Sequence, residues 1–382
     1  MKLSNLLFGA LFVALALAAI FTGNGYQLYI LSLMGLTAIV GIGLNILVGM
    51  SGQISLGHVG FYAIGAYTVA ILTVDHGVSF WVALPIAGLL AGAAGGLLSV
   101  PALRVRGPYL AMITIAFGFI VEQSAAELDG LTGGWNGIMG IRPPQILGLS
   151  FSQREIALFV LLLMLVALFV YARISRSPWG KALRALRDSE VAAQSIGLNP
   201  VLLRCVAFAL SAVFAGIAGG VYGTMSGFIS PESFPFFESI LFLLVVMIGG
   251  ADTILGPVIG AVIIVLLPEI FSSLAEYRLL FVGILLLVVL RIAPSGIVGS
   301  VLGRLGRRRP AAVPKAPADA HDLAARHGTG RRLEVDNVSI SFGGVRAGQG
   351  LSLTAEPGRV TGIIGPNGAG KTTALNLIAG FY

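Results

Sequence analysis

Residues 155–172 read EIALFVLLLMLVALFVYA, an almost unbroken apolar run in which Glu155 is the single charged residue. A helix needs about 20 mostly apolar residues to cross a lipid bilayer, so this stretch predicts a membrane-spanning helix. The whole chain of 382 residues has the same character, because 56% of its residues are hydrophobic and only 11% are charged. Soluble domains carry about 25% charged residues. The composition therefore excludes a soluble globular protein, a disordered chain and a secreted disulfide scaffold, and predicts an all-α polytopic membrane protein.

The sequence contains about ten apolar stretches that are candidate transmembrane helices. They lie near residues 6–22, 28–49, 57–74, 81–100, 108–121, 155–172, 205–226, 236–250, 254–274 and 278–292. If the N-terminus is cytoplasmic, 14 of the Lys and Arg residues between residues 1 and 309 fall on the cytoplasmic side and 3 on the other side. This asymmetry is the one that the positive-inside rule requires, and it predicts a multi-pass protein with both termini in the cytoplasm. The first stretch is alternatively a cleaved signal peptide, which leaves the orientation of the others unchanged.

The character of the sequence changes after residue 302. Residues 1–302 form the predicted transmembrane domain, and residues 303–330 are rich in Pro, Ala, Arg and Gly, which predicts a flexible cytoplasmic linker. Of the net charge of +7, residues 303–382 contribute +6, from 11 basic and 5 acidic residues. We interpret this charge as lying beside an anionic face of membrane lipid, and we predict no nucleic-acid partner.

A phosphate-binding loop follows a predicted strand near residues 359–364. The sequence GPNGAGKT at 365–372 matches the pattern G-x-x-x-x-G-K-[ST] and precedes a predicted helix at 372–379. Glycines in such a loop let backbone N–H groups surround phosphate oxygens, and the helix N-terminus adds a favourable dipole. We expect Lys371 to reach the β- and γ-phosphates of ATP, and the Thr372 hydroxyl to bind Mg²⁺. The predicted ATP-binding residues of this loop are Gly365, Pro366, Asn367, Gly368, Ala369, Gly370, Lys371, Thr372 and Thr373.

Residues 331–382 are predicted to be an incomplete α/β P-loop NTPase segment. Alternating apolar residues predict two earlier strands, at 333–340 and 350–354. The sequence ends eleven residues after Lys371, whereas a P-loop ATPase also needs a carboxylate that holds Mg²⁺ and a group that positions water. We therefore assign no catalytic residue and expect this polypeptide alone to have no significant ATPase activity.

The longest predicted cytoplasmic loop, 173–204, is polar and helix-prone. On its residues alone it is also compatible with an interfacial amphipathic helix. Its centre, EVAAQSIG at 190–197, resembles the coupling-helix motif of ABC importer permeases, and the surrounding GKALRALRDSEVAAQSIGLN resembles the branched-chain amino-acid permease family. Two further stretches resemble that family, GIGLNILVGMSGQISLGHVGFYAIGAY at 41–67 and TGGWNGI at 132–138.

The segment after the linker resembles the start of the ATP-binding subunit of the same system, through LEVDNVSISFGG at 333–344 and GPNGAGKTTALNLIAGFY at 365–382. The resemblance implies a permease fused to the beginning of its ATPase, with the later ATPase motifs absent. It further implies that Glu190, Ala193 and Gly197 form the coupling helix. It also implies that Phe342 stacks on adenine, although its residue type and position are equally explained by a core residue at the end of a strand.

The resemblance implies the permease component of an ATP-driven importer of branched-chain amino acids in the bacterial cytoplasmic (inner) membrane. The expected partners are a second permease subunit, ABC ATPase subunits and a periplasmic substrate-binding protein, which the TGGWNGI loop is expected to help dock. Urea and short amides are alternative substrates. A secondary transporter or channel with a vestigial nucleotide-binding tail is an alternative of another class, and predicts transport that is insensitive to substitution of Glu190.

The substrate path is predicted from polar residues near helix breaks and inside spans. Gln53, Ser55 and His58 lie in the break SGQISLGH between two spans, and Glu122 lies near the outer end of another. Polar groups at a helix break face a substrate in many transporters, but a lone histidine is also explained as a satisfied structural residue. Glu238 and Glu269 are either carboxylates of the pathway or residues at the membrane interface.

Overall fold

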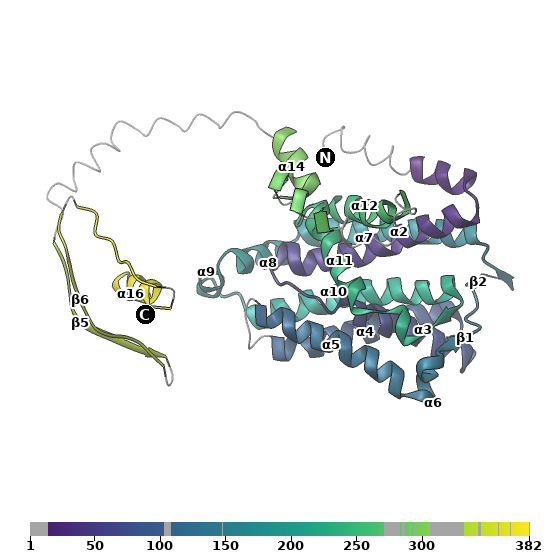
Figure 1. Ribbon diagram of the computed structural model, residues 1–382, viewed down its shortest axis with the longest axis horizontal. Helices are drawn as coiled ribbons and strands as arrows, with labels where there is room; N and C mark the ends of the chain where they lie inside the picture. The colour runs from purple at the N-terminus through teal and green to yellow at the C-terminus, as the bar shows by residue number, and fades with distance from the viewer. Residues whose placement is uncertain are drawn as a thin grey trace. The chain divides into compact units, whose positions relative to one another are not determined.

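The computed structural model describes residues 14–102, 108–146, 148–270, 283–284, 287–289, 291–293, 295–305, 332–342, 345–357, 359–366 and 368–381. The chain divides into two compact units, Met1–Gly306 and Arg307–Tyr382. Figure 1 shows a helical first unit and a second unit that contains a β-hairpin. Each unit is described by itself.

The first unit is a bundle of apolar helices (Figure 1). Its long helices are α2 (Gly25–Asn45), α3 (His58–Val74), α4 (Phe80–Ala102), α5 (Pro108–Glu127), α7 (Gln153–Arg176), α10 (Pro200–Ser226), α11 (Phe236–Gly249) and α12 (Gly256–Ile270). Shorter elements are the π-helix η1 (Ile46–Met50), the helices α6 (Asp129–Thr132), α8 (Pro178–Asp188), α9 (Glu190–Ser195) and α14 (Gly296–Leu305), and the 3₁₀ turns η2 (Gly134–Asn136) and η3 (Pro231–Ser233). Two antiparallel strand pairs join β1 (Ile138–Met139) to β4 (Phe228–Ile229) and β2 (Gln145–Ile146) to β3 (Leu149–Ser150).

The prediction of a multi-pass helical membrane protein is confirmed, but the count of about ten spans is not. Among the described residues, six helices are long and apolar enough to cross a membrane, and two shorter apolar helices, His58–Val74 and Gly256–Glu269, accompany them. The first and last predicted stretches, near 6–22 and 278–292, lie partly outside the described residues. The other predicted stretches each overlap one of the long helices of the bundle.

Small residues let α10 approach its neighbours α3 and α4 closely. A Cβ atom placed on Gly65 of α3 would lie 2.0 Å from the carbonyl oxygen of Gly216, and one placed on Gly219 would lie 1.9 Å from the carbonyl oxygen of Tyr62. Backbone contact at this distance excludes any side chain at these positions. Such packing holds helices together in lipid, where burial of apolar surface gives little drive for association.

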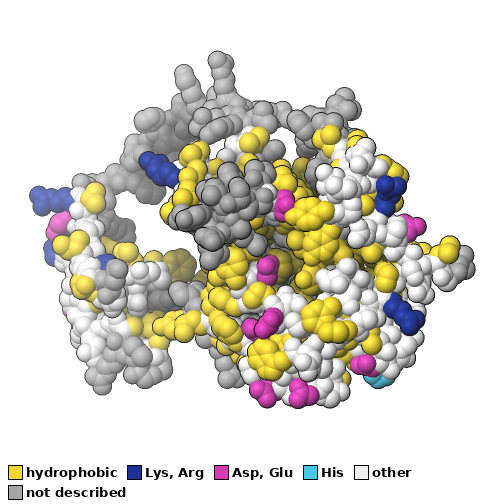
Figure 2. Space-filling view, turned by 45° about the vertical axis from the view of Figure 1, so that its right-hand side comes forward, with side chains coloured by type: hydrophobic (Ala, Val, Ile, Leu, Met, Phe, Trp, Pro, Cys, Tyr) yellow, Lys and Arg dark blue, Asp and Glu magenta, His cyan; other side chains and the backbone are white. Residues whose placement is uncertain are grey.

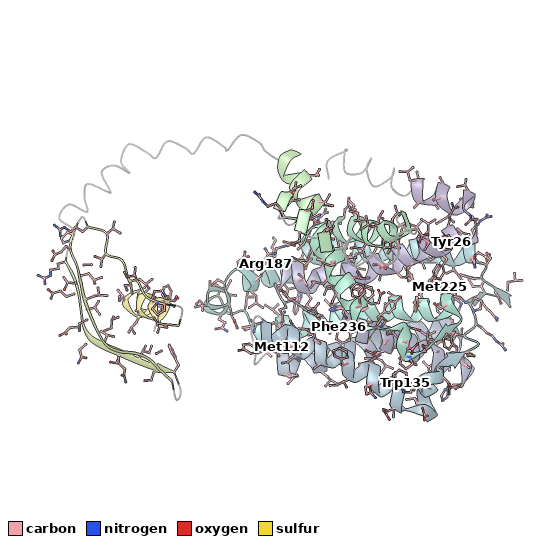
Figure 3. All side chains as sticks on the ribbon, viewed as in Figure 1. Tyr26, Met112, Trp135, Arg187, Met225 and Phe236 are labelled. Atoms are coloured by element: carbon pink, nitrogen blue, oxygen red, sulfur yellow. The ribbon has the colours of Figure 1, made fainter. Side chains whose placement is uncertain are left out.

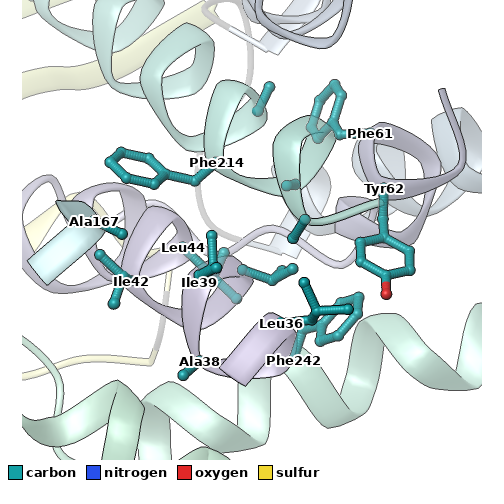
Figure 4. Close-up of a cluster of buried hydrophobic side chains, with 14 of the residues drawn as sticks. Leu36, Ala38, Ile39, Ile42, Leu44, Phe61, Tyr62, Ala167, Phe214 and Phe242 are labelled. Carbon is teal, nitrogen blue, oxygen red and sulfur yellow. The ribbon is translucent and has the colours of Figure 1, made fainter. Parts of the chain in front are cut away.

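The core of the bundle surrounds α2, whose side chains are buried from Gly35 to Asn45. Figure 4 shows Leu36, Ile39 and Ile42 of this helix within a cluster that also includes side chains of α3, α7, α10 and α11. The helix then changes to the π-helical turn η1, and helix resumes only at His58. The predicted break SGQISLGH therefore lies directly after a π-turn, a feature that is frequent at functional sites.

The second unit contains an antiparallel hairpin of β5 (Leu333–Phe342) and β6 (Val345–Ala355), which includes both strands predicted before the phosphate-binding loop. The helix predicted after the loop is present as α16 (Lys371–Ile378). The strand predicted at 359–364 is wrong, because these residues have no regular secondary structure. A strand needs a hydrogen-bonded neighbour, and among the described residues β5 and β6 pair with each other, which leaves Val360 and Ile364 fully exposed.

Candidate functional site

The segment predicted to couple to an ATPase folds into two short helices, α8 and α9, that follow the end of α7. Ser177 caps α8 by accepting a hydrogen bond from the N–H of Gly180 at 3.4 Å, and Pro178 occupies its first turn. Ser189 caps α9 by accepting from the N–H of Ala192 at 3.3 Å. Caps of this type fix where a helix begins, so the local sequence sets the shape of the whole segment.

The three predicted coupling residues have different environments. Glu190 accepts a hydrogen bond from Arg204 of α10 at 3.0 Å, which ties α9 to a long helix of the bundle. Ala193 is buried, and Gly197 turns the chain with a φ of 84°. Val191 and Ile196 are 64% and 74% exposed. The segment therefore presents apolar side chains outward while Glu190 and Ala193 hold it to the bundle.

Arg184 of α8 forms a forked ion pair with Asp252, in the turn between α11 and α12. Its Nη2 donates to Oδ1 at 2.7 Å, and its Nε donates to Oδ1 and Oδ2 at 2.9 and 2.8 Å. The same guanidinium donates to the carbonyl and hydroxyl oxygens of Ser175 at 2.8 and 2.6 Å. The hydrogen bond to Asp252 raises the pKa of Arg184 above its usual value, against a smaller opposing effect of burial. The pair fixes α8 to the α11–α12 turn.

Asn45, the last residue of α2, extends this contact into the bundle. Its Oδ1 accepts from the N–H of Asp252 at 2.8 Å, and its Nδ2 donates to the Tyr171 hydroxyl and the Thr253 carbonyl oxygen, both at 2.9 Å. Arg187 donates to Asp252 Oδ2 at 3.3 Å and to the carbonyl oxygen of Gly49 in η1. The network of Arg184, Arg187, Asp252, Asn45 and Tyr171, here called the α8 network, thus joins α8, α7, η1 and the α11–α12 turn.

Sequence reasoning did not find the α8 network. Its members are up to 207 residues apart, and they match no spaced motif. Two local signals were available. Asn45 is a polar residue inside an apolar run, and Asp252 has a φ of 61°, which is uncommon for a residue other than glycine.

A cavity of about 260 Å³ lies in the bundle between α2, α3, α10, α11 and α12. Tyr26, which donates a hydrogen bond to the lining residue Glu269, and Arg187 of the α8 network lie at opposite ends of the bundle (Figure 3). The cavity lining is a mixture of apolar and polar side chains. Its notable polar and aromatic residues are Tyr29, Tyr62, Tyr222, Phe242, Glu238 and Glu269.

The four residues predicted for the substrate path are not among the lining of this cavity. Hydrogen bonds join the two ring nitrogens of buried His58 to the hydroxyls of Ser55, at 3.0 Å, and Ser211, at 2.6 Å. Gln53 donates to the Ser51 hydroxyl at 2.7 Å. Glu122 lines a separate narrow pocket beside Tyr67, whose buried hydroxyl has no hydrogen-bond partner among the described residues. The polar side chains of the break are therefore hydrogen-bonded to other residues of the bundle. Their role in transport stays a prediction.

The phosphate-binding loop has the backbone shape that its glycines allow. Gly368 and Gly370 have φ values of 87° and 75°, and the loop leads directly into α16. Lys371 Nζ donates to the carbonyl oxygens of Gly365 and Pro366 at 2.8 and 2.7 Å, so its ammonium group bridges the start of the loop. Asn367 lies outside the described residues. The donor set of backbone N–H groups, one lysine and one hydroxyl fits a nucleotide phosphate and its Mg²⁺.

Comparison with known proteins matches both units of the chain. Residues 26–290 match the family of the permease component of branched-chain amino acid transport systems, and residues 349–382 match the ABC transporter family. The high-affinity branched-chain amino acid transport system permease protein LivM of Escherichia coli is 42% identical over 284 residues, which cover 68% of this chain and 67% of that protein. A probable LivM of Methanocaldococcus jannaschii is 25% identical, over 56% of this chain and 67% of that protein.

The second unit matches ATP-binding proteins over a short segment. The high-affinity branched-chain amino acid transport ATP-binding protein BraF of Pseudomonas aeruginosa is 50% identical over 50 residues, which cover 13% of this chain and 20% of that protein. The chain thus spans only the part of an ATP-binding protein that contains the phosphate-binding loop. No solved structure matches the chain.

Proposed function

Since this chain belongs to the branched-chain amino-acid permease family of ABC transporters, we propose that it moves leucine, isoleucine and valine into the cell across the bacterial cytoplasmic membrane. The observation that carries the proposal is the family match over residues 26–290, which contains both the helical bundle and the outward α8–α9 segment. A bundle that only anchored a nucleotide-binding segment would need neither a cavity nor a coupling segment.

In this proposal, α8 and α9 face the cytoplasm and the ATPase partner, and the end of the bundle that contains Tyr26 faces the periplasm. The distribution of cations, 14 inside and 3 outside, supports this orientation. The exposed side chains of Val191 and Ile196 are the apolar contacts offered to the ATPase. Both termini then lie in the cytoplasm.

The α8 network supports a route by which motion of the ATPase would reach the membrane-spanning helices. A displacement of α9 acts on α10 through the ion pair of Glu190 with Arg204. A displacement of α8 acts on the α11–α12 turn through Arg184, and on η1 through Arg187. Because η1 adjoins the break at 51–57, a displacement of the network would act on the segment where helical structure is interrupted between α2 and α3. Rearrangement there opens the substrate path alternately to each side.

The second unit supplies the start of a nucleotide site. Lys371 and the loop N–H groups would hold the phosphates of ATP, Thr372 and Thr373 follow at the N-terminus of α16, and Thr372 would hold Mg²⁺. Bound ATP supplies the free energy for transport. Phe342 is 45% exposed at the end of β5, as an adenine-stacking side chain requires.

The remaining partners are a second permease subunit and a periplasmic binding protein. The loop that contains TGGWNGI supports docking of the latter, since Trp135 is 59% exposed. Its glycines shape the loop, and a Cβ atom on Gly137 would lie 2.1 Å from the carbonyl oxygen of Ile229. The loop is therefore a fixed surface that presents an aromatic side chain, the type of residue that anchors many interfaces.

Uptake in a strain that lacks its own branched-chain amino-acid permeases tests this function. Expression of the chain with its partner subunits should restore uptake of labelled leucine and leave uptake of labelled urea at background. Restoration of urea uptake alone would assign the chain to the urea and short-amide permeases instead.

A further inference from the structure

The cavity between α2, α3, α10, α11 and α12 combines apolar walls with two carboxylates, those of Glu238 and Glu269. Its volume of about 260 Å³ is just below the range of about 300–1,000 Å³ that holds drug-sized ligands, so it suits a molecule of amino-acid size. Among the described residues that line it, none is basic. Figure 2 shows acidic side chains set among hydrophobic ones on the face that it presents.

Tyr62 is an independent indication that the cavity takes a polar ligand. Its side chain is only 7% exposed and its ring lies 5.6 Å from that of Phe242, measured between centroids. Figure 4 shows its hydroxyl at the edge of the buried cluster. Within the described part of the chain this hydroxyl makes no hydrogen bond, although Tyr62 lines the cavity. The hydroxyl of a largely buried side chain that lines the cavity and has no protein partner among the described residues is available to a polar ligand there.

Glu269 is held in place on the other side of the cavity. The hydroxyl of Tyr26 donates a hydrogen bond to its Oε1 atom. This contact leaves the second carboxylate oxygen of Glu269 available as an acceptor, since a carboxylate offers about four acceptor sites. A carboxylate within a membrane-spanning bundle is costly and typically marks a pathway for a substrate or ion.

From this arrangement we propose that the cavity is a substrate subsite that binds the primary ammonium group of an aliphatic amino acid, with Glu238 and Glu269 as acceptors. The apolar walls take the branched side chain, and the Tyr62 hydroxyl completes the polar contacts. The inference rests on the proposed import function and specifies which part of the substrate the permease recognises. It predicts that urea, which has no ammonium group, binds this cavity less tightly than leucine.

The inference makes the ammonium group necessary and the substrate carboxylate dispensable. The test measures binding of labelled leucine to the assembled transporter in lipid nanodiscs, without a binding protein, so that only the membrane subunits select. Leucinamide retains the ammonium group and should compete about as well as leucine. 4-Methyl-2-oxopentanoate retains the side chain and carboxylate but has no ammonium group, and should compete at least about tenfold less well.

Variants locate the site. Glu238→Gln and Glu269→Gln should each weaken leucine binding about tenfold, because each removes a charged hydrogen bond. Tyr62→Phe keeps the ring and should weaken it several-fold. Glu232→Gln, on η3 and not part of the lining, is the matched control and should bind as the wild type does. A thermal unfolding curve for each variant shows whether it is folded.

The outcomes separate this inference from the proposed function. If the wild type imports leucine and folded Glu238→Gln and Glu269→Gln variants bind it as tightly as the wild type, the subsite is wrong and the function stands. Equal competition by 4-methyl-2-oxopentanoate, or no saturable binding at millimolar leucine, also overturns the subsite. If the wild type imports no leucine in the presence of all its partners, the function itself is wrong.

Discussion

Arg184 donates hydrogen bonds to both carboxylate oxygens of Asp252, with donor–acceptor distances of 2.7 to 2.9 Å. The two residues belong to α8 and to the turn between α11 and α12, and their side chains are 26% and 23% exposed. A forked pair of this kind fixes orientation as well as distance. It therefore fixes α8 to the turn between α11 and α12.

Replacement of the Arg184 guanidinium by the single ammonium group of lysine tests the role of its ion pair with Asp252. Arg184→Lys keeps the charge but loses the parallel hydrogen bonds to Asp252 and the contacts with Ser175. Because the pair is about one-quarter exposed, we expect a modest loss of stability, about 1–2 kcal/mol. The number of leucine molecules imported per ATP hydrolysed should fall several-fold. Lys181→Ala, at an exposed position of the same helix, should leave this ratio unchanged, and an unchanged ratio in Arg184→Lys would show that the fork transmits no force.

Asn45 is the buried centre of the α8 network, and its removal should cost more than the loss of one hydrogen bond. Asn45→Ala deletes three hydrogen bonds and leaves the N–H of Asp252 without its acceptor. We expect a loss of about 2–4 kcal/mol. Tyr171→Phe removes one of these bonds and should cost about 1 kcal/mol. Chemical denaturation in detergent measures both, and equal stability of the two variants would contradict a central role for Asn45.

Close packing of α10 gives a prediction that is independent of transport. Gly219→Ala places a methyl group 1.9 Å from the carbonyl oxygen of Tyr62, so α3 and α10 must separate. The expected cost is about 3 kcal/mol or more, seen as a lower yield of folded protein. Gly96→Ala, where the added atom meets nothing within 4 Å, is the control and should fold normally. Normal yield of Gly219→Ala would mean that this helix contact is looser than described.

The exposed apolar residues of the α9 region should bind the ATPase partner. Val191→Glu and Ile196→Glu put a charge on each exposed position and should abolish co-purification of the ATPase subunit with the permease, since a buried unpaired charge is strongly unfavourable at an interface. Met139→Glu adds the same charge to an exposed residue of β1 and should not affect co-purification. Retention of the ATPase by both α9-region variants would place its docking surface elsewhere.

Elements with a strong local signal were predictable from the sequence. The apolar runs at 155–172 and 205–226 overlap α7 and α10, because the length of an apolar run is a property of neighbouring residues. The run at 108–121 was predicted too short, since α5 continues to Glu127 through polar residues that still favour helix. The strand at 359–364 was wrong because a strand depends on a neighbour that a local pattern does not reveal.

The site was predictable only in part, for the same reason. The short helix α9 was predictable from the polar, helix-prone sequence of its loop, and its contact through Glu190 with Arg204 joins residues that are close in the sequence. The contacts of Asp252 with Arg184 and Asn45 join distant segments, and only the fold brings them together. For His58 the sequence left two interpretations open, the substrate path and a satisfied structural residue, and the structure bonds both ring nitrogens within the bundle.

We propose that this chain imports branched-chain amino acids with the free energy of ATP. The most direct measurement is accumulation of labelled leucine in proteoliposomes that contain the chain, its partner permease and its ATPase, with the binding protein on the substrate side. Leucine should accumulate only when ATP is present on the ATPase side, and Arg184→Lys should reduce the accumulation. Equal accumulation of leucine without ATP would identify a secondary transporter and contradict ATP-driven import.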